Sequence, residues 1–569
     1  MGCDPAGVRS VSLSNALDRY LAQYHFRHPV NATFIGMHVL DDRLPDWSPA
    51  GLAADADEMR RIRTALDDTK GPTAAQMRAR PLLLDGELAR ANLDVRLAEN
   101  DSGFFYARNP ALWTGEAIFA VVSLMIRDFA PAVERLPAIA ARLSGIVKFL
   151  AALPVTVKAV PQPWIARAVR ECVAADGLFD RGLRGWLDHH AIAEHDAAGV
   201  LHAATAAREA FATVATWLAD LPAQSTASCT VGEAMFTLLL KRGHFCDDAP
   251  QSLLARALDE LALEQSTLNL MIADHGGTWN DVLGAMAADH PTVDDYYASF
   301  QRRWDECHRI ATEHDAVTWK SWPIRYVPIP VWAQEFAPSL YWLFYRSPAP
   351  FDPYSTYEYV VTPIDATLSP DVAEARLRAW NNSAITLNHV VHHGAVGHHV
   401  QNWHARHRAT SRIGRIAATD CANRIAMFLG GSMAEGWACY ATQLMEELGM
   451  CTPLEKLSEQ HTRVRMLTRA IVDIRLHLGL CTFAEAVQYY QDVVAMPLDV
   501  ATAETTKNSM FPCTAIMYWL GTSTILALRE RVKSAQNAAF SMRAFHDELL
   551  SRGAIPVGLA ATLMTEHGA

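Results

Sequence analysis

The sequence predicts a mainly α-helical protein, built as one large unit with two lobes. Long alanine- and leucine-rich segments with helical spacing occupy residues 55–100, 118–150, 200–221 and 251–273. Apolar side chains that recur every three to four residues are typical of amphipathic helices. Alternation of apolar and polar residues, which indicates strands, is rare in this chain. With 569 residues, half of them hydrophobic, the chain is long enough for several core-sized units.

Capping residues mark several helix starts in the second half of the chain. Thr452 and Glu455, and likewise Thr482 and Glu485, place a hydroxyl three residues before a glutamate, which is the pattern of a capping box. A serine precedes Pro370, and proline is favoured at the first position of a helix. These patterns predict three helices that begin at or next to these residues.

The few strand candidates lie in the middle of the chain. The best is at residues 324–331, and the second is at residues 357–363. A proline- and aromatic-rich stretch at residues 321–353 divides the chain. We therefore predict an N-terminal helical lobe at residues 1–320 and a C-terminal helical lobe at residues 321–569, joined as one integrated unit.

The composition excludes two classes of partner. The net charge is −12, whereas binding to nucleic acid needs basic residues clustered on one face. Residues 508–528 contain no charged side chain, but they include Pro512, Gly521 and several Ser and Thr residues. This stretch therefore predicts a buried core helix and not a membrane span. We expect neither nucleic acid nor a membrane as a partner, and the sequence leaves the oligomeric state open.

The cysteines and the first residues predict a compartment. Ten cysteines are scattered along the chain without a CxxC pair. The opening residues, MGCDPAG, lack the basic and then apolar pattern of a secretory signal. Free thiols are typical of a reducing environment, so we expect a cytoplasmic protein.

A dense group of histidines is the strongest chemical feature of the sequence. Residues 389–407 read HVVHHGAVGHHVQNWHARH and include seven histidines. Imidazole is the commonest protein metal ligand and titrates near neutral pH. The apolar flanks have helical spacing, and Gly394 and Gly397 interrupt the run. The segment therefore indicates a metal or proton-transfer site on a buried helix that bulges or kinks at the glycines.

The spacing of the histidines leaves two candidate pairs. His392 and His398 are six residues apart, and a straight helix would separate their Cα atoms by about 9 Å along its axis. They converge on one metal only if the backbone bends between them. His389 and His393 are four residues apart and share a helix face without any bend. A run of buried or surface histidines that binds no metal is the third interpretation.

Glu435 is the candidate for a third ligand. A carboxylate oxygen that joins two imidazoles is found in many catalytic zinc sites. However, Ser432 and Glu435 also match a capping box, in which the glutamate reaches back to the backbone at the helix start. The spacing alone does not choose between these two interpretations.

Three residues that recur every four positions form another feature. Arg469, Asp473 and His477 stack along one helix face, and the simpler interpretation is an intrahelical ion-pair ladder. In a functional interpretation either Asp473 orients a histidine or Arg469 binds a substrate carboxylate bidentately. Tyr518 lies in an uncharged segment, where a tyrosine usually packs in the core, although its hydroxyl could also donate to an oxyanion.

Several of these motifs resemble those of one family. Residues 392–401, HHGAVGHHVQ, resemble the HEAIPGHHLQ motif of a large, mostly uncharacterised bacterial family of helical, zinc-peptidase-like proteins. Residues 432–440 resemble its EGWALY motif. The family's RLVVDxGLH, PGQAxxYxxG and FHDxxLxxGxxP patterns resemble, in that order, residues 469–477, 512–521 and 545–556. More weakly, residues 28–46 resemble its amino-terminal segment.

The resemblance implies an elongated, gluzincin-like helical protein with a deep central cleft. It implies one divalent metal ion, which we expect to be zinc, held by His392, Glu435 and one histidine of the His398–His399 pair. Of that pair we favour His398. The resemblance also implies that further residues line the cleft and support the ligands or contact the substrate: Asp473, His477 and Tyr518.

The chain departs from the family pattern at the position of the catalytic base. The HE pair of the family is His392-His393 here. In zinc peptidases that glutamate accepts a proton from the attacking water and passes it to the leaving amine. An imidazole at His393 could accept a proton or could bind the metal itself. The family's Arg-Tyr before PGQA is Lys507-Asn508, and its Gln is Thr514, so several expected substrate contacts change as well.

Three functions follow from the sequence. The first is a metal-dependent hydrolase of a peptide or small amide, with His393 as the base and Tyr518 or His399 stabilising the oxyanion. The second is a non-hydrolytic metalloenzyme of small-molecule metabolism, a lyase, cyclase or redox enzyme, with iron or another transition metal in place of zinc. The third is an inactive scaffold that binds a ligand or partner. We favour the first, because histidine can perform acid–base chemistry.

Overall fold

The computed structural model is almost entirely helical, as the sequence predicts, with three short strands. It describes the following residues: 5–66, 71–222, 229–320, 322, 324–337, 345–346, 349–351, 357–417 and 427–565. The described residues up to 220 contain eleven α-helices: α1 (Pro5–Arg27), α2 (Pro29–Phe34), α3 (Pro49–Ala65), α4 (Ala74–Ala79), α5 (Pro81–Asp101), α6 (Pro110–Met125), α7 (Ala132–Ala151), α8 (Leu153–Thr156), α9 (Gln162–Gly177), α10 (Leu183–His189) and α11 (Glu194–Asp220).

The remaining helices surround a small sheet. The middle of the chain holds α12 (Glu233–Leu238), α13 (Pro250–His275), α14 (Trp279–Ala288), α15 (Tyr296–Glu313), β1 (Arg325–Pro328), α16 (Val331–Gln334), β2 (Tyr345–Arg346), β3 (Glu358–Val361) and α17 (Pro370–Ala379). The end of the chain holds the π-helix η5 (Ala384–Gly394), α18 (His398–His407), α19 (Arg412–Ile416), α20 (Met427–Glu447), α21 (Pro453–His477), α22 (Phe483–Val494), α23 (Leu498–Met510), α24 (Met517–Gln536), α25 (Met542–Leu550) and α26 (Val557–Thr565).

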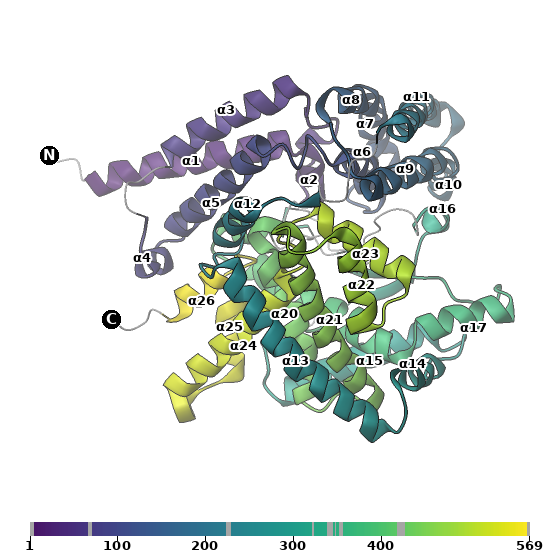
Figure 1. Ribbon diagram of the computed structural model, residues 1–569. Helices are drawn as coiled ribbons and strands as arrows, with labels where there is room; N and C mark the ends of the chain where they lie inside the picture. Colours follow the sequence, from purple (N-terminus) through teal and green to yellow (C-terminus); the bar gives the residue numbers. More distant parts are fainter. Residues whose placement is uncertain are drawn as a thin grey trace.

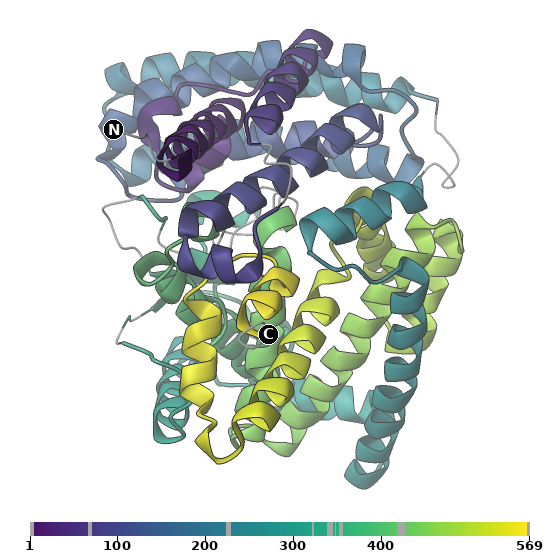
Figure 2. The ribbon, with the colours of Figure 1, turned by 90° about the vertical axis from the view of Figure 1, so that its left-hand side faces the viewer.

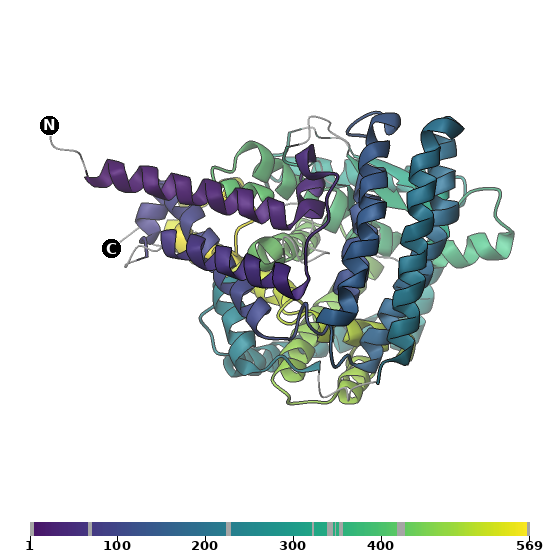
Figure 3. The ribbon, with the colours of Figure 1, turned by 90° about the horizontal axis from the view of Figure 1, so that it is seen from above.

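The helices form two layers. The helices from α1 to α11, in purple to blue, lie above those from the green and yellow part of the chain (Figure 2). In the lower layer α20 and α21 lie centrally, with α13 packed against α21 (Figure 1). In the upper layer α7 and α11 pack lengthwise against each other, which is visible from above (Figure 3).

Two hydrophobic cores hold the layers together, and each contains residues from both halves of the chain. One core joins Phe211 of α11 to Ile471 of α21. The other joins Leu17 of α1 to Leu563 of α26. Burial of apolar surface is the main favourable term in folding, so each half of the chain depends on the other for a complete core.

Local sequence signals explain where the helices start and stop. Thr452 and Thr482 each accept a hydrogen bond from the backbone of the glutamate three residues later, which confirms both capping boxes. Residues 55–100 are divided among three helices, because Thr73 caps α4 and Pro81 starts α5. Pro131 is the N-cap residue of α7, directly after the break between α6 and α7.

The small sheet lies beside the π-helix η5. Both predicted strands are present, and β1 pairs with β3 in parallel while β2 pairs with β3 in the antiparallel direction. Tyr359 of β3 is buried, and its hydroxyl is hydrogen-bonded to Nδ1 of His389 at 2.7 Å. The hydroxyl of Tyr326, from β1, donates to the carbonyl of His389 at 3.4 Å. The sheet therefore supports the segment that carries the histidines.

The two apolar segments that raise the question of a membrane both lie in the protein interior for part of their length. Residues 508–528 are no single helix, because α23 ends at Met510 and α24 begins at Met517. Among the described residues, Ala132–Thr156 is long and apolar enough to span a membrane by length and composition. Its side chains at Leu136 and Leu143 belong to the first core, and a core helix passes the same test.

Candidate metal centre

A break in the backbone brings His392 and His398 together. The π-helix η5 ends at Gly394, and α18 starts at His398. A Cβ atom at Gly397 would lie 1.9 Å from the carbonyl oxygen of His392, so only glycine permits this approach. The rings of His392 and His398 are consequently 4.9 Å apart between centroids, at an angle of 89°. The predicted bend at the glycines is therefore present.

Two buried tryptophans hold the broken segment in place. Trp304 Nε1 donates to the carbonyl of Gly394 at 2.8 Å. Trp437 Nε1 donates to the carbonyls of Val396, at 2.8 Å, and Gly397, at 3.1 Å. The bonds to Gly394 and Val396 satisfy carbonyls at the interruption of the helix, whereas the Gly397 carbonyl also accepts from the backbone of Gln401. Because Trp437 is two residues after Glu435 on α20, the same helix supplies a candidate ligand and fixes the turn between the two histidines.

Glu435 points at the histidines and does not cap a helix. Helix α20 starts at Met427, so Ser432 and Glu435 lie inside it. The Ser432 hydroxyl accepts a hydrogen bond from the backbone of Val557 at 3.2 Å. Glu435 Oε2 is 3.3 Å from Nε2 of His392 and 3.6 Å from Nε2 of His398. The capping-box interpretation of this pair is therefore wrong.

The two distances from Glu435 to the histidines fit a metal ion, although the three residues whose ligand atoms all lie within 4.8 Å of one another are His392, His393 and His398. Ligands at about 2.0–2.1 Å from a tetrahedral zinc ion lie about 3.3 Å from one another. The distances of 3.3 and 3.6 Å from Glu435 to the two imidazoles are close to this value. They exceed the usual range of about 2.7–3.2 Å for an N–H···O hydrogen bond. The donor set of two imidazoles and one carboxylate is also that of several catalytic zinc sites.

The protonation states suit a cation. Burial lowers the pKa of His392, which outweighs the opposing effect of Glu435. Burial acts to raise the pKa of Glu435, but the neighbouring imidazoles of His392 and His398 outweigh it and hold this pKa well below the usual range. At neutral pH the site therefore offers an ionised carboxylate beside a neutral imidazole at His392, which is the state in which these groups bind metals.

His393 lies against the same centre. Ring nitrogens of His392, His393 and His398 lie within 4.8 Å of one another. His393 Nδ1 donates to the carbonyl of Asn388 at 2.6 Å, which leaves Nε2 with its lone pair. Burial and then the neighbouring imidazoles hold the pKa of His393 well below 6.5. The structure thus places an unprotonated nitrogen beside the other two imidazoles.

The remaining histidines of the cluster have structural partners. His389 stacks on Trp380, with 4.2 Å between ring centroids. His399 is fully buried, and its Nε2 donates to the carbonyl of Trp322. Within the described part of the chain, the group with metal-binding spacing contains neither of them. The rival pair of His389 and His393 does not form such a group, because His389 is engaged by Tyr359 and Trp380 while His393 lies beside His392 and His398.

Asp473 and His477 organise a loop and do not reach the histidines. Asp473 accepts hydrogen bonds from the backbone of Cys513 and Ile516 at 3.1 and 3.0 Å. Burial raises the pKa of Asp473 to about 7, and these backbone bonds oppose the shift. His477 Nε2 donates to the carbonyl of Asn508 at 2.9 Å. Both residues thus fix the connection between α23 and α24.

Arg469 and Tyr518 contact each other. The guanidinium of Arg469 lies 4.3 Å from the centre of the Tyr518 ring, and its Nε is 2.7 Å from Glu504. Tyr518 is half-buried. An arginine that is already paired with a carboxylate is a poor receptor for a second one. The structure therefore does not favour Arg469 as the residue that binds a substrate carboxylate.

Sequence reasoning missed Arg465, which lies four residues before Arg469. Its side chain is exposed, whereas every other residue from Leu457 to Leu478 of the α21 region is buried or half-buried. Arg465 lies close enough to His392 to lower the pKa of that histidine. The available signal was the four-residue periodicity of Arg469, Asp473 and His477, which continues backwards to this position.

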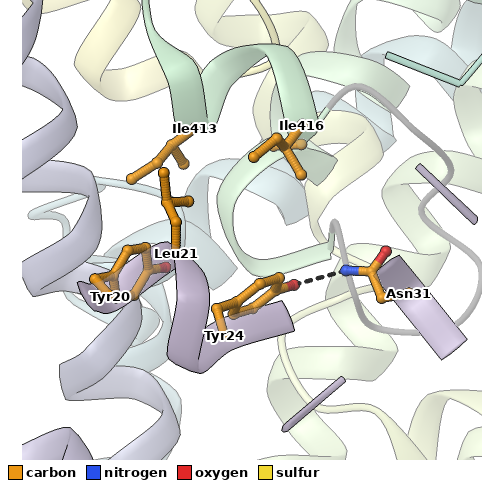
Figure 4. Close-up of a pocket in the computed structure, with 7 residues that line it drawn as sticks. Tyr20, Leu21, Tyr24, Asn31, Ile413 and Ile416 are labelled. Atoms are coloured by element: carbon orange, nitrogen blue, oxygen red, sulfur yellow. Dashed lines mark hydrogen bonds between the residues drawn. The ribbon is translucent and has the colours of Figure 1, made fainter. Parts of the chain in front are cut away.

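A pocket between α1 and α19 differs from the histidine cluster in the residues that line it. Tyr20, Leu21 and Tyr24 of α1 face Ile413 and Ile416 of α19 across it (Figure 4). None of the residues that line this pocket belongs to the histidine cluster. Its walls are mostly apolar and offer no carboxylate or imidazole for catalysis.

The fold and the site define an all-helical protein with a candidate metal centre of two histidines and one glutamate. The chain belongs to the family described as bacterial protein of unknown function (DUF885), which matches residues 29–564. That description names neither zinc nor a peptidase activity, so both stay proposals. No curated protein matches the chain.

Two solved structures share the fold. One is the structure of a candidate lipoprotein of unknown function from Shewanella oneidensis, with 19% identity, a TM-score of 0.76, and coverage of 97% of this chain and 100% of that one. The other is a candidate lipoprotein from Colwellia psychrerythraea, with 17% identity, a TM-score of 0.74, and coverage of 97% and 98%. At this identity the likeness shows the fold alone.

The cytoplasmic location expected from the sequence is contradicted by this comparison. Both similar proteins are described as lipoproteins, a class that is anchored to a membrane or secreted. The free cysteines did not decide the compartment, because six of the eight described cysteines are buried. A buried thiol packs as a small apolar side chain, whatever the redox potential of the surroundings.

Proposed function

We propose that this protein is a metal-dependent hydrolase that cleaves an amide bond in a peptide or small molecule. The observation that supports it is the convergence of Glu435 Oε2 with Nε2 of His392 and His398, at 3.3 and 3.6 Å. These three residues would hold one divalent ion, and zinc suits this donor set best. When bound, the ion would supply a Lewis acid for a carbonyl oxygen of the substrate.

In this proposal His393 moves the proton. Its Nδ1 is engaged by the carbonyl of Asn388, so Nε2 is the nitrogen that accepts a proton from the attacking water and returns it to the leaving amine. The lowered pKa of His393 keeps that nitrogen unprotonated at neutral pH. The lowered pKa also makes His393 a weaker proton acceptor than a carboxylate whose pKa lies near 7. We therefore expect slow turnover.

A second function, that of a non-hydrolytic metalloenzyme, is supported by the position of His393. A ring nitrogen of His393 lies within 4.8 Å of those of His392 and His398, which makes it a candidate fourth donor. Three imidazoles and a carboxylate suit iron or another transition metal as well as zinc. If His393 binds the metal, it cannot also act as the base in place of the glutamate of the family motif. The chemistry would then be that of a lyase, cyclase or redox enzyme.

Two variants of one residue separate these functions. We would measure metal content by elemental analysis, and hydrolysis of a panel of amides, for the parent and for His393→Ala and His393→Glu. If His393 is the base, His393→Ala keeps its metal and loses turnover, while His393→Glu restores the family pair and raises turnover. The matched control is His407→Gln, because His407 bonds the Trp403 carbonyl and does not belong to the metal-spaced group.

Other outcomes overturn the proposal. Loss of the metal in His393→Ala would make His393 a ligand and favour the second function. A parent protein that holds no metal and takes up neither zinc, iron nor manganese would exclude both functions. An inactive scaffold would then be the remaining interpretation.

A further inference from the structure

The imidazole of His398 lies between two oxygen atoms from different helices. Helix α18 begins at His398, and Gln401 is three residues later on the same helix, where side chains are neighbours. Oε1 of Gln401 is 3.4 Å from Nδ1 of His398. Oε2 of Glu435, on α20, is 3.6 Å from Nε2 of the same ring. Each ring nitrogen of His398 therefore has its own oxygen partner.

These two contacts indicate which nitrogen of His398 carries the proton. A neutral imidazole has one N–H donor and one nitrogen with a lone pair. A nitrogen that binds a metal must keep its lone pair, so the other nitrogen carries the proton. If Nε2 faces the ion together with Glu435, then Nδ1–H donates to Oε1 of Gln401. Histidines that bind metals almost always donate their second nitrogen to an acceptor of this kind.

The side-chain amide of Gln401 is not explained by packing. Gln401 is only 2% exposed. Among the residues that the structure describes, its Nε2 atom is buried and has no hydrogen-bond partner. An unpaired buried donor destabilises a fold, and an apolar side chain of the same length would avoid that loss. The contact of Oε1 with His398 is therefore the feature that accounts for a glutamine at this position.

The same arrangement is present at His393. Its Nδ1 donates to the carbonyl of Asn388 at 2.6 Å. Both imidazoles thus hold Nδ1 against an oxygen, which leaves the lone pair on Nε2 of each ring. The acceptor at His393 belongs to the backbone, whereas the acceptor at His398 belongs to a side chain. Only the contact with Gln401 can be removed by substitution of the acceptor.

We propose that Gln401 is a positioning residue of the candidate metal centre, and that it holds His398 in the tautomer and orientation that bind the ion. This inference rests on the proposed function and deepens it, because it assigns how one ligand is oriented. The acceptor is a neutral amide. A carboxylate in its place would bond the imidazole N–H more strongly and make Nε2 a better donor to the metal.

Two variants of Gln401 test this role through zinc affinity, which is measured by competition with a chromophoric chelator. Gln401→Met has a side chain of similar length without an acceptor oxygen, and Gln401→Glu keeps the acceptor and adds a charge. We expect Gln401→Met to weaken zinc binding about 10- to 100-fold. Gln401→Glu should bind zinc at least as tightly as the parent, a rescue that packing alone would not produce.

Gln460→Met is the matched control. Gln460 is 4% exposed on α21, and its amide donates to the backbone and the carboxylate of Glu264 on α13. The same substitution there removes a buried amide that bonds α13 and not the histidine cluster. We expect it to lower the unfolding temperature and to leave zinc affinity unchanged. A loss of zinc affinity as large as in Gln401→Met would attribute the effect to stability and overturn the inference.

Cobalt(II) in place of zinc gives a spectroscopic readout of the same contact. A paramagnetic ion shifts the NMR signals of its ligands away from those of the other residues, so the N–H proton of a bound imidazole is observed directly. In Gln401→Met we expect one such proton of the parent to exchange faster with water, because no acceptor holds it. In Gln401→Glu that proton should stay protected. Equal exchange in the parent and in Gln401→Met would contradict the proposed contact.

The inference and the proposed function fail in different ways. If Gln401→Met binds zinc as tightly as the parent, the inference is overturned and the metal centre stays in place. If zinc affinity depends on Gln401 but the loaded protein cleaves no amide, the inference is supported and hydrolysis is contradicted. A parent that binds neither zinc nor cobalt overturns both, because His398 would then not be a ligand.

Discussion

The carboxylate of Glu435 lies between two imidazoles because its helix begins at Met427, five residues before Ser432. A capping glutamate must sit in the first turn, where backbone N–H groups are free. In the interior of α20 those groups are already bonded, so the side chain turns outward to His392 and His398. The position of one helix start thus decides between two roles that the local sequence supports equally.

Substitution of Glu435 tests this role at the scale of one residue. Loss of a residue that only supports a metal ligand lowers metal affinity about 10- to 100-fold. We expect Glu435→Gln to lower it further, because this variant removes a charged donor. Metal content after dialysis against a chelator measures the effect. Ser432→Ala serves as the control and should keep its metal. Equal retention of metal in both variants would contradict the ligand role.

The turn between η5 and α18 is the element that creates the site. In a continuous helix His392 and His398 would face different directions. Here the backbone folds back so closely that the N–H of Gly397 bonds the carbonyl of Val391 at 2.9 Å. The glycines predicted this bend. The π-helix before it was not predicted, because a bond from i to i+5 has no residue signature in the sequence.

An alanine at position 397 should therefore destroy the centre. Its Cβ would lie 1.9 Å from the His392 carbonyl oxygen, and the backbone must move apart to relieve the clash. We expect Gly397→Ala to lose bound metal and to lower the unfolding temperature. Gly199→Ala is the control, since a Cβ there meets nothing within 4 Å and alanine stabilises a helix by about 0.5–1 kcal/mol relative to glycine. Full metal content in Gly397→Ala would contradict the proposed geometry.

At the scale of the whole molecule, buried histidines link stability to pH. Burial lowers the pKa to about 4 in at least four of them: His25, His399, His477 and His546. In the unfolded chain the pKa of each is about 6.5. The stability from these neutral side chains is therefore complete above pH 6.5 and is lost as the pH falls from 6.5 towards 4, because only the unfolded chain takes up the protons.

We expect the unfolding temperature of the metal-free protein to fall between pH 7.5 and 5.5. Each such histidine would contribute on the order of 1 kcal/mol to this loss at pH 5.5. His477→Gln can keep a hydrogen bond to Asn508 but has no titrating group, so its loss should be smaller than that of the parent. His195→Gln, at a side chain that is 83% exposed, should leave the pH dependence unchanged. A flat profile in the parent would contradict this account.

Much of the fold is determined by the sequence alone. Helical periodicity, the capping residues Thr452 and Thr482 and the two middle strands were correctly predicted, because these signals act over a few residues. The sequence also named His392, His398 and Glu435 as candidate ligands, through motif resemblance, and their role as ligands stays a prediction; the bend at the glycines 394 and 397 is present. The predicted boundary at residue 320 is not tested by these observations, although both cores join residues from either side of it.

Only the tertiary structure decides which chemical groups meet. It brings His398 to the centre and directs His399 to the carbonyl of Trp322. It pairs Arg469 with Glu504 and leaves Arg465 open. These choices depend on contacts between helices far apart in the chain, which no local pattern encodes. The sequence determined which side chains could do chemistry, and the packing of α20 and α21 around the broken helix decided which of them lie together.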